Sequence, residues 1–330
     1  MPGRRVTAAD VARAAGISRA TVGYVLNNTP GQTISEDTRR RVLAESARLG
    51  YRPHRAAQDL RRGSSKVILF VLPEWPMETM MGQHLDQAAL DLDEAGYSLV
   101  TWARQPGRRT RPLWELLVPD VVMGLAMFDD DELASMRASG ITKIIPDPAN
   151  PQPLRDWPAI ATGAKLQVEH LWERGHRRLG CAVPTDPRLA RMIDARVDVA
   201  RLAAARLGVE TLDVRAVDYL DGSATEVVDQ WRRAGITGVA GFNDETAAAV
   251  VSAAVRAGVP VPEELAVIGH DDTPLATMFV PSISSIRLDV LGLGRRFAAL
   301  ALGTAEGRPV RADGWEGGIT VIARESTRAR

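Results

Sequence analysis

The sequence predicts an α/β protein with a small helical head and a larger two-lobed α/β body. In the first 65 residues, short amphipathic patterns are separated by residues that stop helices. From Lys66 onward, apolar runs alternate with amphipathic helical stretches, which is typical of parallel sheets covered on both faces. This second part has about 265 residues, which is long for one sheet, so we expect two lobes.

The head predicts three short helices, each with its own start signal. Thr7 begins a capping-box pattern, and Gly16 ends the first helix. Ser18 and Ser35 are typical first caps of the second and third helices. Two helices joined by a short turn containing glycine, with a third for support, form a helix-turn-helix. The residues expected inside are Val11, Ala12, Ala15, Val22, Val25, Leu26, Val42, Leu43, Ala47 and Leu49.

The body predicts eight strands and at least five helices. The strands are Val67–Leu72, Ser98–Ala103, Val121–Met127, Thr142–Pro146, Arg178–Val183, Leu212–Val217, Gly238–Phe242 and Leu265–Gly269. The helices lie around Gln83–Ala95, Lys165–Arg174, Ala190–Leu207, Ala224–Ala234 and Glu245–Ala257. The segment Asp147–Pro158 is rich in proline and polar residues, and we expect the chain to cross between the lobes there.

Charge is distributed unevenly along a chain whose net charge is zero. Residues 1–65 carry twelve arginines and five acidic residues, a net charge of +7, so the remainder carries −7. A basic head on an acidic body suggests that the head meets a polyanion, although a solvated basic surface fits the charge equally. No apolar run approaches a membrane span and no apolar stretch follows the first arginines, so we expect a cytoplasmic protein with no membrane partner.

Several classes of chemistry lack their sequence signals. The single cysteine, Cys181, excludes a disulfide framework and a cysteine-built metal site, and is expected to be buried at a strand end. The chain has no glycine-rich phosphate loop, no nucleophile elbow, and no metal-ligand spacing among its five histidines. We therefore expect no catalytic residues, no cofactor and no metal, and we expect that the protein is not an enzyme.

Two long segments of the head, and four of the body in the expected order, resemble the lactose/galactose repressor (LacI/GalR) family. Those of the head are VTAADVARAAGISRATVGYVLNN and RRRVLAESARLGYRPHRAAQDL. Those of the body are HLWERGHRRLG, GFNDETAAAVVSAAVRAGVPVPEELAVIGHDD, PSISSI and VIARESTR. Residues 107–164 resemble the family poorly, and Ala161–Gly163 reads Ala-Thr-Gly where the family usually has an Asp-Asn pair before the glycine. The resemblance implies a DNA-binding head (1–52), a hinge helix and linker (53–65), and a periplasmic-binding-protein-like domain for effector binding and dimerisation (66–330).

For the head, the resemblance implies which side chains meet DNA. Arg19, Ala20 and Tyr24 match base-reading positions of the second helix, where an arginine pairs with guanine and an alanine touches a thymine methyl. Surface residues of a structural helix bundle are the alternative. The residues expected to contact phosphates or to cap helices are Thr7, Ser18, Thr21, Asn27 and Asn28.

The hinge after Pro53 is too short for a stable isolated helix, so we expect it to fold on DNA. The resemblance implies that Ala57 and Leu60 enter the minor groove, where a leucine wedge kinks the duplex. Arg55 is expected to contact the DNA backbone regardless of sequence. By composition alone, a flexible arginine-rich linker is equally compatible with this segment.

For the body, the resemblance implies an effector between the lobes. Arg196 matches the family's clamping arginine, and Asn243 and Asp271 match positions that bind ligand hydroxyls or amines. Asn243 and Asp271 each follow a predicted strand, and open parallel sheets bind ligands at the carboxyl ends of their strands. The weaker candidates are Trp75, Asp147 and Tyr219. Asp272 is expected to be a capping group. His270, where the family usually has an aromatic residue, is expected either to shape the pocket or to pack.

These observations predict a ligand-responsive, sequence-specific repressor that binds a pseudo-palindromic operator on double-stranded DNA as a homodimer. The effector is expected to be a small molecule, a sugar rather than a purine. The main rival is an exported sugar-binding protein, which would need an export signal and no basic head.

Overall fold

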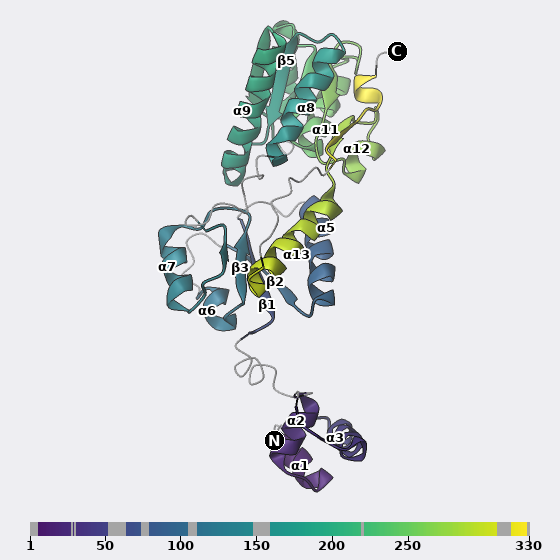
Figure 1. The fold of residues 1–330 in the computed structure, drawn as a ribbon. Helices are drawn as coiled ribbons and strands as arrows, with labels where there is room; N and C mark the ends of the chain where they lie inside the picture. Colours follow the sequence, from purple (N-terminus) through teal and green to yellow (C-terminus); the bar gives the residue numbers. More distant parts are fainter. Residues whose placement is uncertain are drawn as a thin grey trace.

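The computed structural model describes residues 6–27, 29, 31–51, 64–73, 79–104, 111–147, 159–218, 221–308 and 318–328. These form a helical head and a body with two separate four-stranded parallel sheets (Figure 1). The predicted α/β class and the division of the body into two lobes are confirmed. In the described residues, no helix combines the length and apolar character needed to span a membrane.

The head consists of α1 (Ala8–Ala15), α2 (Arg19–Leu26) and α3 (Glu36–Arg48). The predicted caps are confirmed: Thr7 and Asp10 form a capping box, Gly16 ends α1 with φ 64°, and Ser18 accepts a hydrogen bond from the backbone of Thr21. Because these signals involve residues three or four positions apart, the sequence carries them directly. Val11, Val22, Val25 and Val42 form the centre of the small core.

One part of the head prediction was wrong. Leu43 is 50% exposed and Ala47 is also exposed, whereas Ser46 is buried beside Val42. Residues four apart share one face of a helix, so position 46 follows position 42 into the core, and positions 43 and 47 are turned away together.

The first lobe has the strand order β2-β1-β3-β4. Its strands are β1 (Val67–Leu72), β2 (Ser98–Ala103), β3 (Val121–Gly124) and β4 (Ile144–Ile145). Its helices are α5 (Thr79–Glu94), α6 (Leu113–Leu117), α7 (Asp130–Ala138) and α13 (Val290–Glu306). α5 and α13 cover one face of the sheet, and α6 and α7 cover the other. The late helix α13 therefore completes the lobe that the chain builds first.

The second lobe repeats this arrangement, with the strand order β6-β5-β7-β8. Its parallel strands are β5 (Arg178–Val183), β6 (Thr211–Ala216), β7 (Gly238–Gly241) and β8 (Ala266–Ile268). Its helices are α8 (Ala159–Glu173), α9 (Ala190–Leu207), α10 (Ser223–Arg233), α11 (Asp244–Arg256) and α12 (Pro274–Met278). An antiparallel pair, β9 (Ser285–Arg287) and β10 (Thr320–Ile322), and the 3-10 turns η2 (Pro187–Leu189) and η3 (Glu325–Thr327) complete it.

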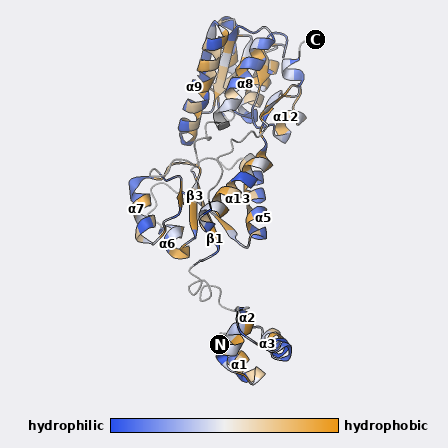
Figure 2. Ribbon diagram, in the orientation of Figure 1, coloured by the Kyte–Doolittle hydropathy of each residue, from blue (hydrophilic) through white to orange (hydrophobic). Residues whose placement is uncertain are grey.

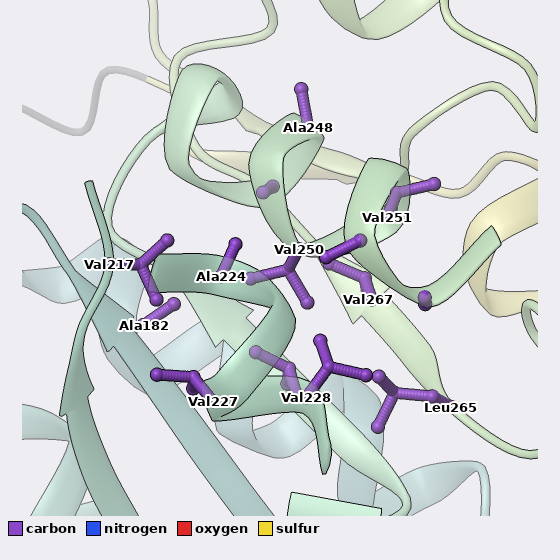
Figure 3. Packing of buried hydrophobic residues seen from close by; sticks show 14 of the residues in the cluster. Ala182, Val217, Ala224, Val227, Val228, Ala248, Val250, Val251, Leu265 and Val267 are labelled. Atoms are coloured by element: carbon purple, nitrogen blue, oxygen red, sulfur yellow. The ribbon is translucent and has the colours of Figure 1, made fainter. Parts of the chain in front are cut away.

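Apolar side chains fill the space between each sheet and its helices. In Figure 2 the hydrophobic residues gather on the strands and on the helix faces turned toward them. Figure 3 shows the core between α10, α11 and the second sheet, where Val228, Val250 and Val267 meet. Cys181 is buried, as predicted, but it lies within β5 and not at a strand end.

Several elements differ from the prediction. The third strand ends at Gly124 instead of Met127, the fourth is only Ile144–Ile145, and α8 begins at Ala159, before the predicted start. The short helices α6, α7 and α12, the long helix α13 and the pair β9–β10 were not predicted. The predicted lobe crossing after Asp147 lies outside the described residues.

Candidate functional site

The exposed face of α2 carries the predicted base-reading residues. Arg19, Ala20 and Tyr24 are all exposed, because Val22 and Val25 turn the opposite face of α2 into the head core. Arg19 stands at the first helical position, directly after the cap. A helix so oriented presents its N-terminal side chains outward, as a recognition helix must.

Four of the residues expected to contact phosphates lie within α2 or at the ends of α1 and α2. Thr7 and Ser18 are helix caps, and the Ser18 hydroxyl also lies 2.9 Å from the Thr21 hydroxyl. Asn27 ends α2 and donates its backbone N–H to the Gly23 carbonyl. The other predicted DNA contacts (Asn28, Arg55, Ala57 and Leu60) lie outside the described residues.

In the body, Arg196 of α9 reaches under the carboxyl ends of the second sheet. Its Nη1 donates to the Phe242 carbonyl oxygen at 2.5 Å, and its guanidinium lies 4.4 Å from the Phe242 ring centroid. Its Nη2 is 3.9 Å from Oδ1 of Asp271. Only 6% of Arg196 is exposed, so its charge is held inside the lobe by the carbonyl, the ring and the carboxylate.

Asp271 has an unusual backbone, with φ 96°, which L-residues rarely adopt. Its backbone N–H donates to the Ile286 carbonyl at 2.8 Å, so β9 holds this conformation. Burial alone would raise the pKa of Asp271, but its interactions with His270 and Arg196 outweigh burial and lower that pKa. The structure thus brings an ionised carboxylate and a guanidinium together from positions 75 residues apart in sequence.

Asn243 joins these residues through its backbone position. It follows β7 and caps α11, where its Oδ1 accepts hydrogen bonds from the backbone and hydroxyl of Thr246 at 2.9 and 2.7 Å. Asn243, Asp271 and the Phe242 carbonyl that binds Arg196 all lie just beyond the carboxyl ends of β7 and β8. Ligands of open parallel sheets bind at this edge.

Of the weaker effector candidates, the structure describes only Asp147, which does not join this group. Asp147 belongs to the first lobe and lies 3.6 Å from the guanidinium of Arg137. Trp75 and Tyr219 lie outside the described residues. Asp272 is not a helix cap, contrary to the prediction: its carboxylate pairs with Arg287 and with Arg324 at 2.6 Å. Two arginines on β9 and after β10 thus secure Asp272 to the edge of the lobe.

His270 packs into the floor of the site. It is fully buried, and its Nδ1 is hydrogen-bonded to Asp271. Burial and then the charge of Arg196 lower its pKa, so the ring is neutral and Nδ1–H donates to the carboxylate. A Cβ on Gly163 would lie 2.1 Å from its Nε2, so the ring occupies the space that a side chain at 163 would need. The absence of a side chain at Gly163 thus makes room for the His270 ring.

Two further residues of this edge were not predicted. Gln167 of α8 donates to the carbonyls of Gly241 and Gly269, both at 2.8 Å, and so ties the ends of β7 and β8 together. Asp244 is fully buried and accepts three hydrogen bonds, from the backbone and hydroxyl of Thr273 and from the Ser285 hydroxyl. Burial raises its pKa to about 7. The sequence could have indicated Gln167, because a polar residue on the apolar face of a helix needs a buried hydrogen-bond partner.

Comparisons with known proteins agree with this geometry. Residues 7–54 match the family described as bacterial regulatory proteins, lacI family, and residues 168–327 match the periplasmic binding protein-like domain. An uncharacterized HTH-type transcriptional regulator of Streptomyces limosus is 30% identical over 306 residues, which cover 86% of this chain and 83% of that protein. The HTH-type transcriptional regulator MalR of Streptomyces coelicolor is 29% identical over 322 residues, covering 91% and 90%.

The fold has close structural counterparts. The lac repressor dimer bound to operator and the anti-inducer ONPF has a TM-score of 0.76 and 23% identity, covering 99% of this chain and 100% of that chain. A helix-turn-helix head on a two-lobed binding domain defines a DNA-binding transcriptional regulator. The chain belongs to the lacI family of bacterial regulatory proteins, and it is a regulator and not an enzyme.

Proposed function

We propose that this protein is a homodimeric repressor whose affinity for a pseudo-palindromic operator is set by a small molecule bound between its lobes. Residues 1–52 form the DNA-binding head, 53–65 the hinge and 66–330 the effector-binding and dimerisation domain. The observation that carries the proposal is the exposed Arg19–Ala20–Tyr24 face on a capped and packed helix-turn-helix.

On DNA, the head places α2 in the major groove. Arg19 pairs with a guanine, Ala20 contacts a thymine methyl, and Tyr24 donates to a base or a phosphate. The residues that hold the register on the backbone are Thr7, Ser18, Thr21, Asn27, Asn28 and Arg55. The hinge enters the central minor groove with Ala57 and Leu60 and bends the duplex there.

The effector site centres on Arg196, Asn243 and Asp271. An ionised carboxylate only accepts hydrogen bonds and a guanidinium only donates them. A sugar hydroxyl does both, so neighbouring hydroxyls satisfy Asp271 and Arg196 without adding charge to a site where these two charges already balance. We assign a neutral sugar in preference to a purine, because each hydroxyl oxygen of a sugar both donates and accepts. The remaining contacts that we propose are Trp75, Asp147 and Tyr219.

The dimer forms through the face of the second lobe that carries α11 and α12. The lining of a groove there includes the apolar residues Ala248, Ala249, Ala253, Leu275 and Phe279 and, among its polar residues, Glu245 and Arg256. Beside it, Met278 is 72% exposed and Val280 is 83% exposed, the largest exposures among the large hydrophobic residues described. A second copy of the same surface covers these side chains, and two symmetric bodies then present two heads to two half-sites.

The test begins with selection of operators from random DNA by the full-length protein. We expect one pseudo-palindromic sequence, and an affinity that falls with log salt at about −0.9 per neutralised phosphate. A flat salt dependence, or no selected sequence, would falsify the DNA-binding mechanism. For the effector, thermal-shift measurements with sugars and purines side by side should show stabilisation by a sugar; stabilisation by purines alone rejects the sugar assignment.

A further inference from the structure

The carboxylate of Asp120 holds the point at which the chain enters the body. Asp120 lies one residue before β3 and accepts hydrogen bonds from the Ser64 hydroxyl, from the Ser65 backbone N–H at 2.6 Å and from the Ser65 hydroxyl at 3.0 Å. Three donors from two successive residues thus converge on one side chain 55 residues away. Hydrogen bonds to an ionised carboxylate are stronger than neutral ones.

The anchored segment is also tied to the sheet on both sides. The Lys66 carbonyl accepts from the Ser98 N–H of β2 at 2.8 Å, and the Val67 carbonyl accepts from the Asp120 N–H at 2.9 Å. Lys66 has φ 55°, in the left-handed region, and its Nζ lies 4.0 Å from the ring centroid of Tyr97. Because β1 lies between β2 and β3, this grip fixes the position and direction of the chain at Ser64 relative to the first lobe.

The position of Ser64 affects which half-site spacing the heads can reach, because a long stretch of chain joins it to the head. Residues 52–63 join the head to the anchor, and twelve residues can span at most about 40 Å. One base pair adds about 3.4 Å along the duplex. A tether with a loose origin would therefore tolerate half-sites one base pair closer or farther apart. A dimer that distinguishes such operators needs a fixed origin for each hinge.

We propose that Asp120 is a positioning residue for DNA binding: by holding Ser64 and Ser65, it fixes where each hinge leaves the body and thereby the half-site spacing that the dimer accepts. The inference rests on the proposed function, because it requires two heads carried by one dimer. It assigns operator-spacing specificity to a residue of the body, outside the DNA-reading helix α2.

The test compares the selected operator with two derivatives that have one base pair inserted or removed at the centre. The full-length wild-type protein should prefer the parent operator by at least about tenfold. Asp120→Ala should reduce this ratio to about threefold or less while still binding the parent operator. Asp120→Asn keeps an acceptor for the Ser65 N–H and should retain more of the ratio. A Ser64→Ala/Ser65→Ala double variant, which keeps Asp120, should also lower it.

Asp129→Ala is the matched control. Asp129 is an aspartate of the same lobe that caps α7 and accepts from the Glu132 N–H at 2.8 Å, so its loss removes a local hydrogen bond without changing the contacts of Ser64 and Ser65. This control should keep the wild-type spacing ratio. The proposal is overturned if Asp120→Ala keeps that ratio, or if Asp129→Ala loses it equally. A wild-type protein that selects no operator overturns the proposed function itself, and no effector is needed for any of these measurements.

Discussion

Single substitutions in the head should distinguish side chains that recognise bases from those that only attract DNA by charge. Arg19→Ala should weaken binding to the selected operator by about 1–3 kcal/mol and relax the preference at one base pair per half-site. Arg13→Ala is the control, because Arg13 is an exposed arginine of the neighbouring helix α1, paired with Asp10. Binding of each variant to a library of operator variants gives both quantities. Equal loss on every sequence for Arg19→Ala would remove its reading role.

In the pocket, Arg196→Ala should lower effector affinity at least tenfold, because hydrogen bonds to charged groups contribute about 1.5–3 kcal/mol each. Arg201→Ala is the matched control on the same helix, since Arg201 is exposed and paired with Asp198. Isothermal titration of both variants with the sugar identified by thermal shift measures the difference. An unchanged affinity in Arg196→Ala would place the effector elsewhere.

His170 should make folding stability depend on pH. Arg174 donates to its Nδ1 at 3.0 Å, so the ring must be neutral and its Nε2–H donates to the Thr327 hydroxyl at 2.8 Å. Burial, and then Arg174, lower its pKa to about 4. Its contribution to stability is therefore present above the unfolded pKa, near 6.5, and is lost as the pH falls toward 4.

The expected loss is up to about 2 kcal/mol after allowance for solvent screening. Asp244 opposes it, because a carboxyl whose pKa is raised to about 7 stabilises the fold at low pH and loses that contribution as the pH rises. The informative quantity is thus the stability difference between wild type and His170→Gln, measured by chemical unfolding from pH 4 to 7. This stability difference should favour the wild type progressively as the pH rises; a constant difference would contradict the lowered pKa of His170.

Among the elements, the contact between α13 and α5 depends on a glycine at the closest approach. A Cβ on Gly294 would lie 2.5 Å from the His84 carbonyl oxygen and 2.8 Å from the Gln87 Cβ. Gly294→Ala should therefore destabilise the protein by about 1–3 kcal/mol. Gly82→Ala on α5 meets nothing within 4 Å and should stabilise by about 0.5–1 kcal/mol. Thermal unfolding midpoints should move in opposite directions, and a shared direction would contradict the packing.

This helix also shows where sequence patterns fail. α13 was not predicted, although its buried residues include Phe297, Leu300 and Ala301. Glycines 292, 294 and 303 lower the helix propensity of the segment, and the reason for Gly294 is visible only once α5 lies against it. By contrast, the runs that became β1, β2 and β5 were predicted with their observed bounds, because continuous or alternating apolar residues mark them locally.

At the scale of the whole molecule, the exposed apolar surface beside α12 should govern dimerisation. Val280→Asp should raise the dimer dissociation constant at least tenfold, because it brings two carboxylates into an apolar interface. Leu202→Asp, on the 60% exposed Leu202 of α9, is the control on the opposite face of the sheet. Analytical ultracentrifugation measures both. If Val280→Asp remains as dimeric as wild type, another surface joins the subunits.

The candidate site was predictable in parts. Arg196, Asn243 and Asp271 were identified through resemblance, and the structure brings them to one edge of the second lobe. Nothing in the sequence indicated that His270 would hydrogen-bond to Asp271 and occupy the space above Gly163, because that contact depends on how α8 packs against the end of β8. Asp272 was wrongly predicted to cap a helix, because its ion pairs also depend on the packed fold. Its partner arginines come from β9 and from the segment after β10.

The sequence by itself determined the helix caps of the head, the alternation of strands and helices in the body and the unequal distribution of charge. Each of these depends on residues within one turn, one strand or one composition window of each other. The tertiary structure alone decided that α13 returns to the first lobe, that Arg196 meets Asp271 and that Asp120 holds Ser64 and Ser65. These contacts join residues tens to hundreds of positions apart, and their energies depend on distances that are defined only after the sheets and helices have packed.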